Sequence, residues 1–464
     1  MIRPFNSSLP LSRLPSVTGD VSRDASNLVN FINQLYHPHV GNSFYVQLYV
    51  CVGFVLVILI LATSVISHRV LHGRAWFLKL WPVAGGTFVI PNSVMAFLNL
   101  QGCFAVVWIA YAILCVPYYK NNGHQKNFFL WRILIWVPLW QGGWWTGFGI
   151  LSAFPDALTL KSKGGMQRRL ILSPLVFNLA CWLVPFVQLA SILPPAILAA
   201  RHYNETLDHY DTWRVAAVAV ATGNGAPAEY DAIRNRALVL WLEVTRAYWY
   251  YGIAMTCWSV WAAICLAVYV PVGAHTLSRI RAQLKLTRRK QRNPETFYLF
   301  NPPIDRGSFV DADRIDLLNA QNPAMSFSTS RVFPPMRPPS TPIVSDKRRP
   351  MTVEQRRIHN LKRVYRNLSV QYYGICMAIL SFFASATIVA CDGYDGARRN
   401  AIATSQVSAN LMAAYVVVLF GLLTIFCIFW RSFDPSLSID IADVESPPIP
   451  TRSKLVALKN RALG

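Results

Sequence analysis

The sequence predicts an all-α polytopic membrane protein, built as a bundle of seven transmembrane helices. Of its 464 residues, 53% are hydrophobic and only 14% are charged, whereas an ordinary soluble chain carries about 25% charged residues. Seven stretches are also nearly free of charge and long enough to cross about 30 Å of hydrocarbon. Together these observations exclude a disordered chain and make a pair of ordinary soluble domains a poor fit.

The seven apolar segments set the predicted domain organisation. Helices 1–5 fall within 45–272 and helices 6 and 7 within 368–430. Among all seven, the only Asp, Glu, Lys, Arg or His is Arg132, near one end of the third segment. The predicted spans are 45–67, 93–117, 130–154, 171–197, 247–272, 368–391 and 406–430.

Basic residues predict the orientation, because Lys and Arg collect on cytoplasmic loops. With the N-terminus outside and the C-terminus inside, 31 of the 44 Lys and Arg residues lie inside and 12 outside. The sequons at Asn6 and Asn204 then lie outside, where we expect glycosylation. A third sequon, at Asn367, lies at the inner face and is expected to stay unmodified.

The polar segments differ in character. We expect 1–44 to be a mostly disordered outer tail with a short amphipathic helix around 28–36. The outer loop 198–246 is interrupted at 223–227, after which apolar residues at helical spacing predict that helix 5 begins outside the membrane. The inner loop 273–367 is basic, and its stretch 293–350 carries 10 Pro, which predicts disorder. The tail 431–464 is expected inside.

Motifs of catalysis and metal binding are missing from the sequence. It has no HExxH, CxxC, Walker loop, GxGxxG or GxSxG motif, and its spans hold no carboxylate or His of the kind ion-coupled transport needs. We therefore predict no enzyme activity, no metal site and no cofactor. The membrane loops account for the net charge of +22, so nucleic acid is not an expected partner.

The third segment contains the best candidate ligand site. Arg132, Trp136, Trp140 and Gln141 are spaced to form an aromatic wall with one cationic end, suited to an amphipathic or anionic small ligand. Tyr248, Tyr251 and Asn410 lie near the outer ends of helices 5 and 7 and complete the candidate set. The alternative is a snorkelling arginine beside interfacial aromatic packing.

This plan of spans and loops resembles that of the G-protein-coupled receptors, in a divergent form such as fungi have. The resemblance covers topology but not motifs. At the inner end of the third span, where these receptors have Asp-Arg-Tyr, this sequence has Leu151-Ser-Ala-Phe-Pro-Asp156. In the seventh span, Asn410-Leu-Met-Ala-Ala-Tyr415 only loosely matches the receptor motif Asn-Pro-x-x-Tyr. The resemblance implies an outer ligand and a cytoplasmic signalling protein that binds at 273–367.

Three functions follow as hypotheses. The first is a receptor-like sensor that couples an outer ligand cavity to a cytoplasmic partner through helices 5 and 6. The second is a non-ion-coupled carrier or lipid-handling protein. The third is a membrane scaffold that acts through its cytoplasmic loop. In each case the lipid bilayer is a partner, and the expected location is the plasma membrane, with the endoplasmic reticulum or another endomembrane as the alternative.

Overall fold

The computed structural model of the chain describes its helices and two short hairpins. Asn6, the Pro-rich stretch 293–350 and the tail from 434 onward lie outside the described residues, so the expectations for these parts stay predictions. The described residues are 14–37, 40–73, 75–83, 86–120, 126–152, 159–161, 168–170, 173–224, 226–292 and 353–433.

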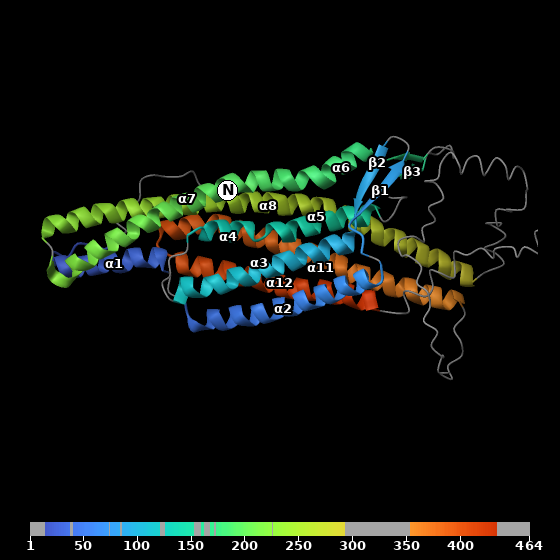
Figure 1. Cartoon of the computed structure of the whole chain (residues 1–464), viewed down its shortest axis with the longest axis horizontal. Helices are drawn as coiled ribbons and strands as arrows, with labels where there is room; N and C mark the ends of the chain where they lie inside the picture. Colours follow the sequence, from blue (N-terminus) through green and yellow to red (C-terminus); the bar gives the residue numbers. More distant parts are fainter. Residues whose placement is uncertain are drawn as a thin grey trace, which may run out of the picture.

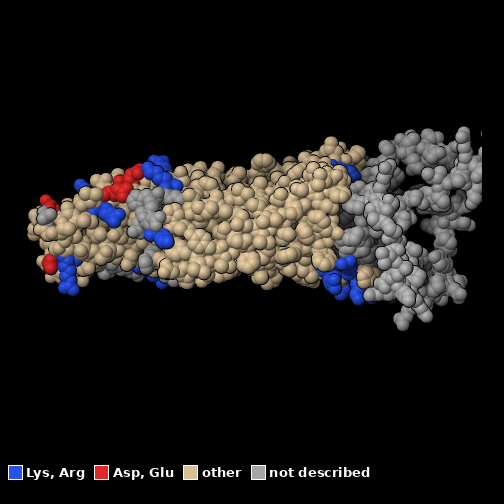
Figure 2. Space-filling view, turned by 60° about the horizontal axis from the view of Figure 1, so that its bottom comes forward, with Lys and Arg blue, Asp and Glu red and all other residues tan. Residues whose placement is uncertain are grey.

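Six helical segments are long and apolar enough to cross a membrane, as expected of an integral membrane protein. They lie along a common long axis (Figure 1). Charged side chains gather toward the two ends of the face drawn in Figure 2, and a wide band between them carries none among the described residues. The helices in these segments are α2 (Asn42–Leu71), α3 (Ser93–Lys120), α7 (Val184–Ala219), α8 (Pro227–Arg292), α11 (Val353–Arg398) and α12 (Ile402–Phe433).

The third predicted span is two helices rather than one. Helix α4 (Phe128–Leu134) and helix α5 (Val137–Ser152) are separated by Ile135 and Trp136. Pro138 follows the break closely, and proline has no N–H to donate to the carbonyl of Leu134 and has a ring that crowds that carbonyl. The predicted span 130–154 is therefore divided into two shorter helices over its described residues, which end at 152.

The fourth predicted span begins with an irregular turn. Helix α6 (Pro174–Asn178) is followed by a π-helical turn, Leu179–Leu183, and then by α7. Pro185, the second residue of α7, has no backbone N–H and so cannot donate the hydrogen bond that a regular helix would make at this position. The π-helical turn lies directly before α7, whose second residue is this proline.

Helices α7 and α8 extend well beyond the ends of α2, α3 and α12 (Figure 1). They are joined around Gly223, whose φ of 88° suits glycine. Helix α1 (Val21–Tyr36) packs against both of them, and we call these three helices the tip assembly. The interruption near Gly223 and the early start of α8 confirm the sequence analysis.

Helix α1 contains the short amphipathic helix that the sequence predicted around 28–36 and begins earlier, at Val21. Residues 1–13 lie outside the described part of the chain. The apolar face of α1 is buried against its neighbours, which gives this amphipathic helix a partner and fixes it in place. The Ser22 hydroxyl also donates a hydrogen bond to the carbonyl of Ala221. The buried face consists of Ala25, Leu28, Ile32, Leu35 and Tyr36.

The opposite end of the molecule carries two short antiparallel hairpins that the all-α prediction omitted. Strand β1 (Leu78–Val83) pairs with β2 (Gly86–Pro91), and β3 (Thr159–Lys161) pairs with β4 (Arg168–Leu170). The Asn178 side chain of α6 fastens β2, accepting from Val89 N at 2.9 Å and donating to Thr87 O at 2.8 Å. We call this the strand end of the molecule.

Candidate functional site

Arg132, the one charged residue in the predicted spans, is buried next to the tip assembly. Only 4% of its surface is exposed. Its guanidinium carbon lies 5.1 Å from the centroid of the Tyr251 ring on α8. At that distance the negative face of the ring attracts the cation, and burial strengthens the attraction.

Other tyrosines surround the same guanidinium. Tyr111, Tyr119 and Tyr248 lie close enough to interact with it electrostatically. The amide of Asn410 links two of them, since its Nδ2 donates to the Tyr119 hydroxyl at 3.2 Å and its Oδ1 accepts from the Tyr111 hydroxyl at 3.3 Å. This Arg132 cluster thereby joins α3, α4, α8 and α12.

A second layer of rings fills the space around the cluster. The hydroxyls of Tyr118 and Tyr203 are 3.0 Å apart, and the Phe128 ring stacks on Tyr118 with centroids 4.3 Å apart. Phe129 meets Tyr203 and Tyr248 edge to face at 4.9 and 5.0 Å. Such aromatic pairs contribute about 0.5–1.5 kcal/mol each beyond the area they bury.

The structure therefore brings together four of the seven predicted ligand-site residues: Arg132, Tyr248, Tyr251 and Asn410. The sequence analysis missed the tyrosines of α3 and α7. Tyr118 and Tyr119 appear in the sequence as an aromatic pair at a span end, which is also the pattern of a membrane-interface anchor. Their meeting with α4 is a tertiary contact that sequence spacing does not report.

The other three predicted residues lie elsewhere. Trp136 packs between Phe104 and Phe382, at centroid distances of 5.6 and 5.3 Å. Trp140 stacks on Trp144 and donates to the carbonyl of Trp261 at 3.2 Å, and Gln141 is half-buried. The ring contacts that Trp136 and Trp140 make are therefore with side chains other than the tyrosines around Arg132.

The Arg132 cluster is a packed junction rather than an open pocket. Arg132, Tyr248 and Tyr251 are each less than 5% exposed. A buried cation held by neutral phenols and ring faces fixes the relative positions of four helices. Movement of one of these helices then requires the others to adjust.

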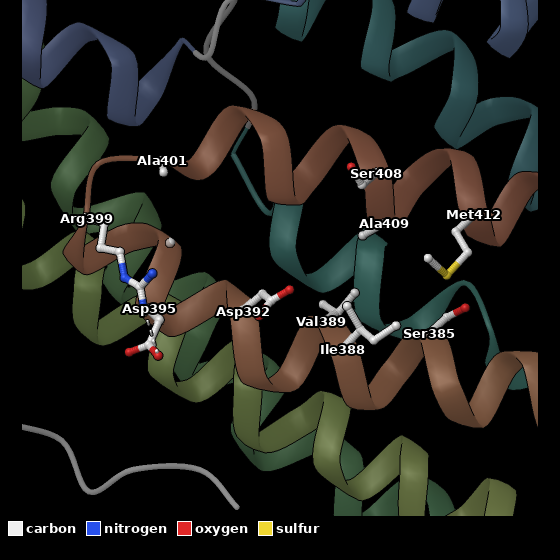
Figure 3. A pocket seen from close by; sticks show the side chains of 11 residues that line it. Ser385, Ile388, Val389, Asp392, Asp395, Arg399, Ala401, Ser408, Ala409 and Met412 are labelled. Atoms are coloured by element: carbon white, nitrogen blue, oxygen red, sulfur yellow. Dashed lines mark ion pairs between the residues drawn. The ribbon is translucent and has the colours of Figure 1, made fainter.

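An open pocket of about 350 Å³ lies nearby, between α11 and α12 (Figure 3). Asp392 is exposed there, and Asp395 pairs with Arg399 at 3.6 Å. Its walls combine these charges with apolar side chains. The lining residues are Ser385, Ile388, Val389, Asp392, Asp395, Gly396, Arg399, Ala401, Ser408, Ala409 and Met412.

This pocket, which we call the tip pocket, is not among the sites that the sequence predicted. Its charged lining consists of the carboxylates of Asp392 and Asp395 and the guanidinium of Arg399, which pairs with Asp395. Ile388, Val389 and Met412 supply the apolar part of the wall. The sequence analysis missed the pocket because it placed the end of the sixth span at residue 391, one residue before Asp392.

The sequon at Asn204 lies within helix α7, not in a loop. Its Nδ2 donates to Asn127 Oδ1 at 2.8 Å, and its Oδ1 accepts from the backbone N–H of Asn127 at 2.8 Å. Asn127 has a φ of 62° and directly precedes α4. The pair therefore ties the start of α4 to α7, and it uses the amide nitrogen that a glycan would occupy.

Within the described ranges, no three His, Cys, Asp or Glu side chains are grouped so as to hold a metal ion. Comparisons with protein families, curated proteins and solved structures give no match to this chain.

Proposed function

We propose that this chain is a seven-span, receptor-like membrane sensor with its tip assembly outside and its strand end in the cytoplasm. The observation that carries the proposal is the length and continuity of α8. This helix has 66 residues, which corresponds to roughly 100 Å at 1.5 Å per residue. It runs from the turn of the tip assembly to a basic extension beyond the strand end.

Helix α11 accompanies α8 and supports the same proposal. At the tip, the Trp241 indole nitrogen of α8 donates to the carbonyl of Ala397 at 3.0 Å. Toward the strand end, the Tyr372 hydroxyl of α11 donates to Val270 O at 2.9 Å. A tilt or rotation of α8 at one end is therefore passed to the pair at the other end, which is rigid-body switching.

The α8–α11 contact is too tight to slide freely. A Cβ added at Gly273 would lie 1.9 Å from the Tyr372 ring, so the absence of a side chain allows the close approach. Farther along, Arg281 lies over the Tyr365 ring at 5.9 Å. The ends of the two helices flank 293–352, so we propose that the signalling partner binds within 273–367.

A seventh crossing is part of the proposal. Helices α4 and α5 follow one another along the bundle axis (Figure 1), and together they lead the chain from the tip end to the strand end. With this crossing the N-terminus is outside and the C-terminus inside, as the distribution of Lys and Arg favours. The ligand would enter the tip pocket and carry a cationic group toward Asp392.

A distance measurement across the cytoplasmic extensions tests the proposal. Spin labels on unnatural amino acids at the exposed positions Ala282 and Gln355 leave the nine native cysteines unchanged. The full-length protein is placed in phosphatidylcholine nanodiscs, with and without Trp241→Phe, which removes the hydrogen bond to Ala397. We expect the substitution to shift the distribution of distances between the labels.

The matched control is Val239→Ala, on the same helix with a side chain that is 59% exposed. It should leave the distribution unchanged. If Trp241→Phe also leaves it unchanged while the protein stays folded, the tip assembly and the extensions are not coupled. The sensor proposal would then be wrong, and a carrier or scaffold function would replace it.

A further inference from the structure

A groove of about 950 Å³ lies between α11 and α12 on the strand-end half of the molecule. It opens to the surface, because many of its lining residues are exposed. One face of α11 forms most of it. The exposed residues of this face are Lys362, Arg366, Val370, Tyr373 and Met377, at intervals of three or four positions along the helix.

The groove changes character along its length. Near the end of the bundle its rim is basic, with Lys362, Arg363 and Arg366. Deeper in the predicted span it becomes apolar, with Val370, Tyr373 and Met377 on α11. Across from them, α12 contributes Phe420 and Leu423.

Close packing of α12 gives the apolar part a floor. A Cβ added at Gly374 would lie 3.0 Å from Leu423 Cδ2, so the glycine lets Leu423 approach the α11 backbone. On the α11 side, Tyr373 and Met377 lie one turn apart and remain exposed, at 62% and 50%. The result is a shallow apolar channel with a cationic mouth.

The length of the channel matches one bilayer leaflet. Lys362 and Met377 are 15 positions apart on α11, which corresponds to about 22 Å at 1.5 Å per residue. One leaflet with its headgroups is about 20–22 Å thick, half of a 40–45 Å bilayer. A headgroup at Lys362 and Arg366 would therefore place an acyl chain along Val370, Tyr373 and Met377.

We infer that this groove binds one anionic phospholipid, with its phosphate at the basic mouth and an acyl chain in the apolar channel. Charge complementarity selects an anionic headgroup, and the apolar channel distinguishes a lipid from a soluble anion. The inference does not depend on the sensor proposal. In the proposed orientation the mouth faces the cytoplasmic leaflet, where anionic lipids are concentrated.

Photo-crosslinking and native mass spectrometry test the inference. Full-length protein is reconstituted in phosphatidylcholine nanodiscs with and without a phosphatidylserine that carries a diazirine on one acyl chain. We expect crosslinks at Tyr373 or Met377 and one retained phosphatidylserine per chain. Lys362→Gln together with Arg366→Gln should weaken binding roughly 30-fold, at about 1 kcal/mol for each basic residue.

The matched control is Arg279→Gln with Arg288→Gln, which removes two exposed charges of α8 at the same end and should leave retention unchanged. Val370→Trp keeps every charge but fills the channel, and it should also reduce retention. Equal losses in the groove and control variants would show non-specific attraction and overturn the inference. Displacement of the lipid by inorganic phosphate would also overturn it, because the site would then bind a free anion.

Discussion

The indole nitrogen of Trp241 donates a 3.0 Å hydrogen bond to the main-chain carbonyl oxygen of Ala397, and this contact fastens the end of α11 to the tip assembly. Both residues are fully buried. The Phe31 ring of α1 meets the same indole edge to face, with centroids 5.2 Å apart. Three helices that are distant in sequence thus meet at one side chain.

Trp241→Phe should destabilise the protein, because it leaves the buried Ala397 carbonyl without its donor. A lost partner of this kind costs about 1–3 kcal/mol. Thermal unfolding of the detergent-solubilised protein, followed by circular dichroism, measures the effect. Val239→Ala, at an exposed position of the same helix, should change the midpoint little, and equal midpoints for all three proteins would mean that the contact contributes nothing.

Arg132 and Tyr251 should be energetically coupled. In a double-mutant cycle with Arg132→Gln and Tyr251→Leu, we expect a coupling energy of about 1–2 kcal/mol, since the cation–π contact is desolvated. Unfolding free energies of the four proteins give this value. Arg132→Gln with Tyr269→Leu serves as the control pair, because Tyr269 lies five turns along α8 and should behave additively.

A coupling energy near zero for Arg132 and Tyr251 would contradict the assignment of the cluster as a junction. It would mean that the guanidinium gains nothing from the ring beneath it. We expect a favourable coupling energy instead, because Arg132 is only 4% exposed. Water can replace the Tyr251 ring beside the guanidinium only if the packing of α4 on α8 opens.

Pro138 should be the cause of the break between α4 and α5. Pro138→Ala supplies an N–H that can donate to the carbonyl of Leu134, a gain of about 1 kcal/mol. We expect hydrogen exchange over 134–138 to slow roughly fivefold. Pro117→Ala, in the uninterrupted helix α3, controls for proline removal in general, and unchanged exchange over 134–138 would assign the break to packing instead.

Apolar length was enough to predict most of the spanning helices, because the hydrocarbon core sets it directly. Pro138 alone did not predict the break between α4 and α5, because a proline does not always interrupt a helix. Pro117, for example, lies inside the uninterrupted helix α3. The two hairpins were missed because six- and three-residue strands are too short for a hydropathy search to detect.

The tip assembly and the Arg132 cluster escaped prediction for a different reason. Helix α1 is polar on one face, and its partners α7 and α8 begin at Val184 and Pro227, far along the chain from it. Asn410 was part of the predicted site, but its hydrogen-bond partners Tyr111 and Tyr119 come from another helix. Spacing along one helix places residues on a face, whereas contacts between helices depend on packing that no local pattern encodes.

The docking of α1 should weaken at acidic pH through Asp24. Burial alone would raise the pKa of this carboxyl, but hydrogen bonds from the Thr18 hydroxyl, the Thr18 N–H and the Gly19 N–H hold the pKa below its ordinary value of 3.8. A lowered folded-state pKa stabilises the docked helix at pH values above 3.8, and this stabilisation is lost as the pH falls through the folded-state pKa.

A spin label at the exposed position Ser26 reports this docking. The mobility of the spin label should rise on acidification below about pH 3.8. Asp24→Asn should flatten this pH dependence, because the asparagine side chain does not titrate. Asp231→Asn, which removes an exposed carboxylate of α8, should leave the transition in place. If Asp24→Asn keeps the same pH profile, another group controls the docking.

Glycosylation mapping should test both the orientation of the protein in the membrane and the position of Asn204 within helix α7. With the tip end outside, Asn6 and Asn204 both face the compartment where glycans are added. The amide of Asn204 is held by Asn127 within a helix, whereas acceptor asparagines belong to surface loops. In a eukaryotic host we therefore expect Asn6→Gln to abolish the glycosidase-induced gel shift and Asn204→Gln to leave it intact. Modification of Asn367 would instead invert the orientation and remove the basis for a cytoplasmic partner at 273–367.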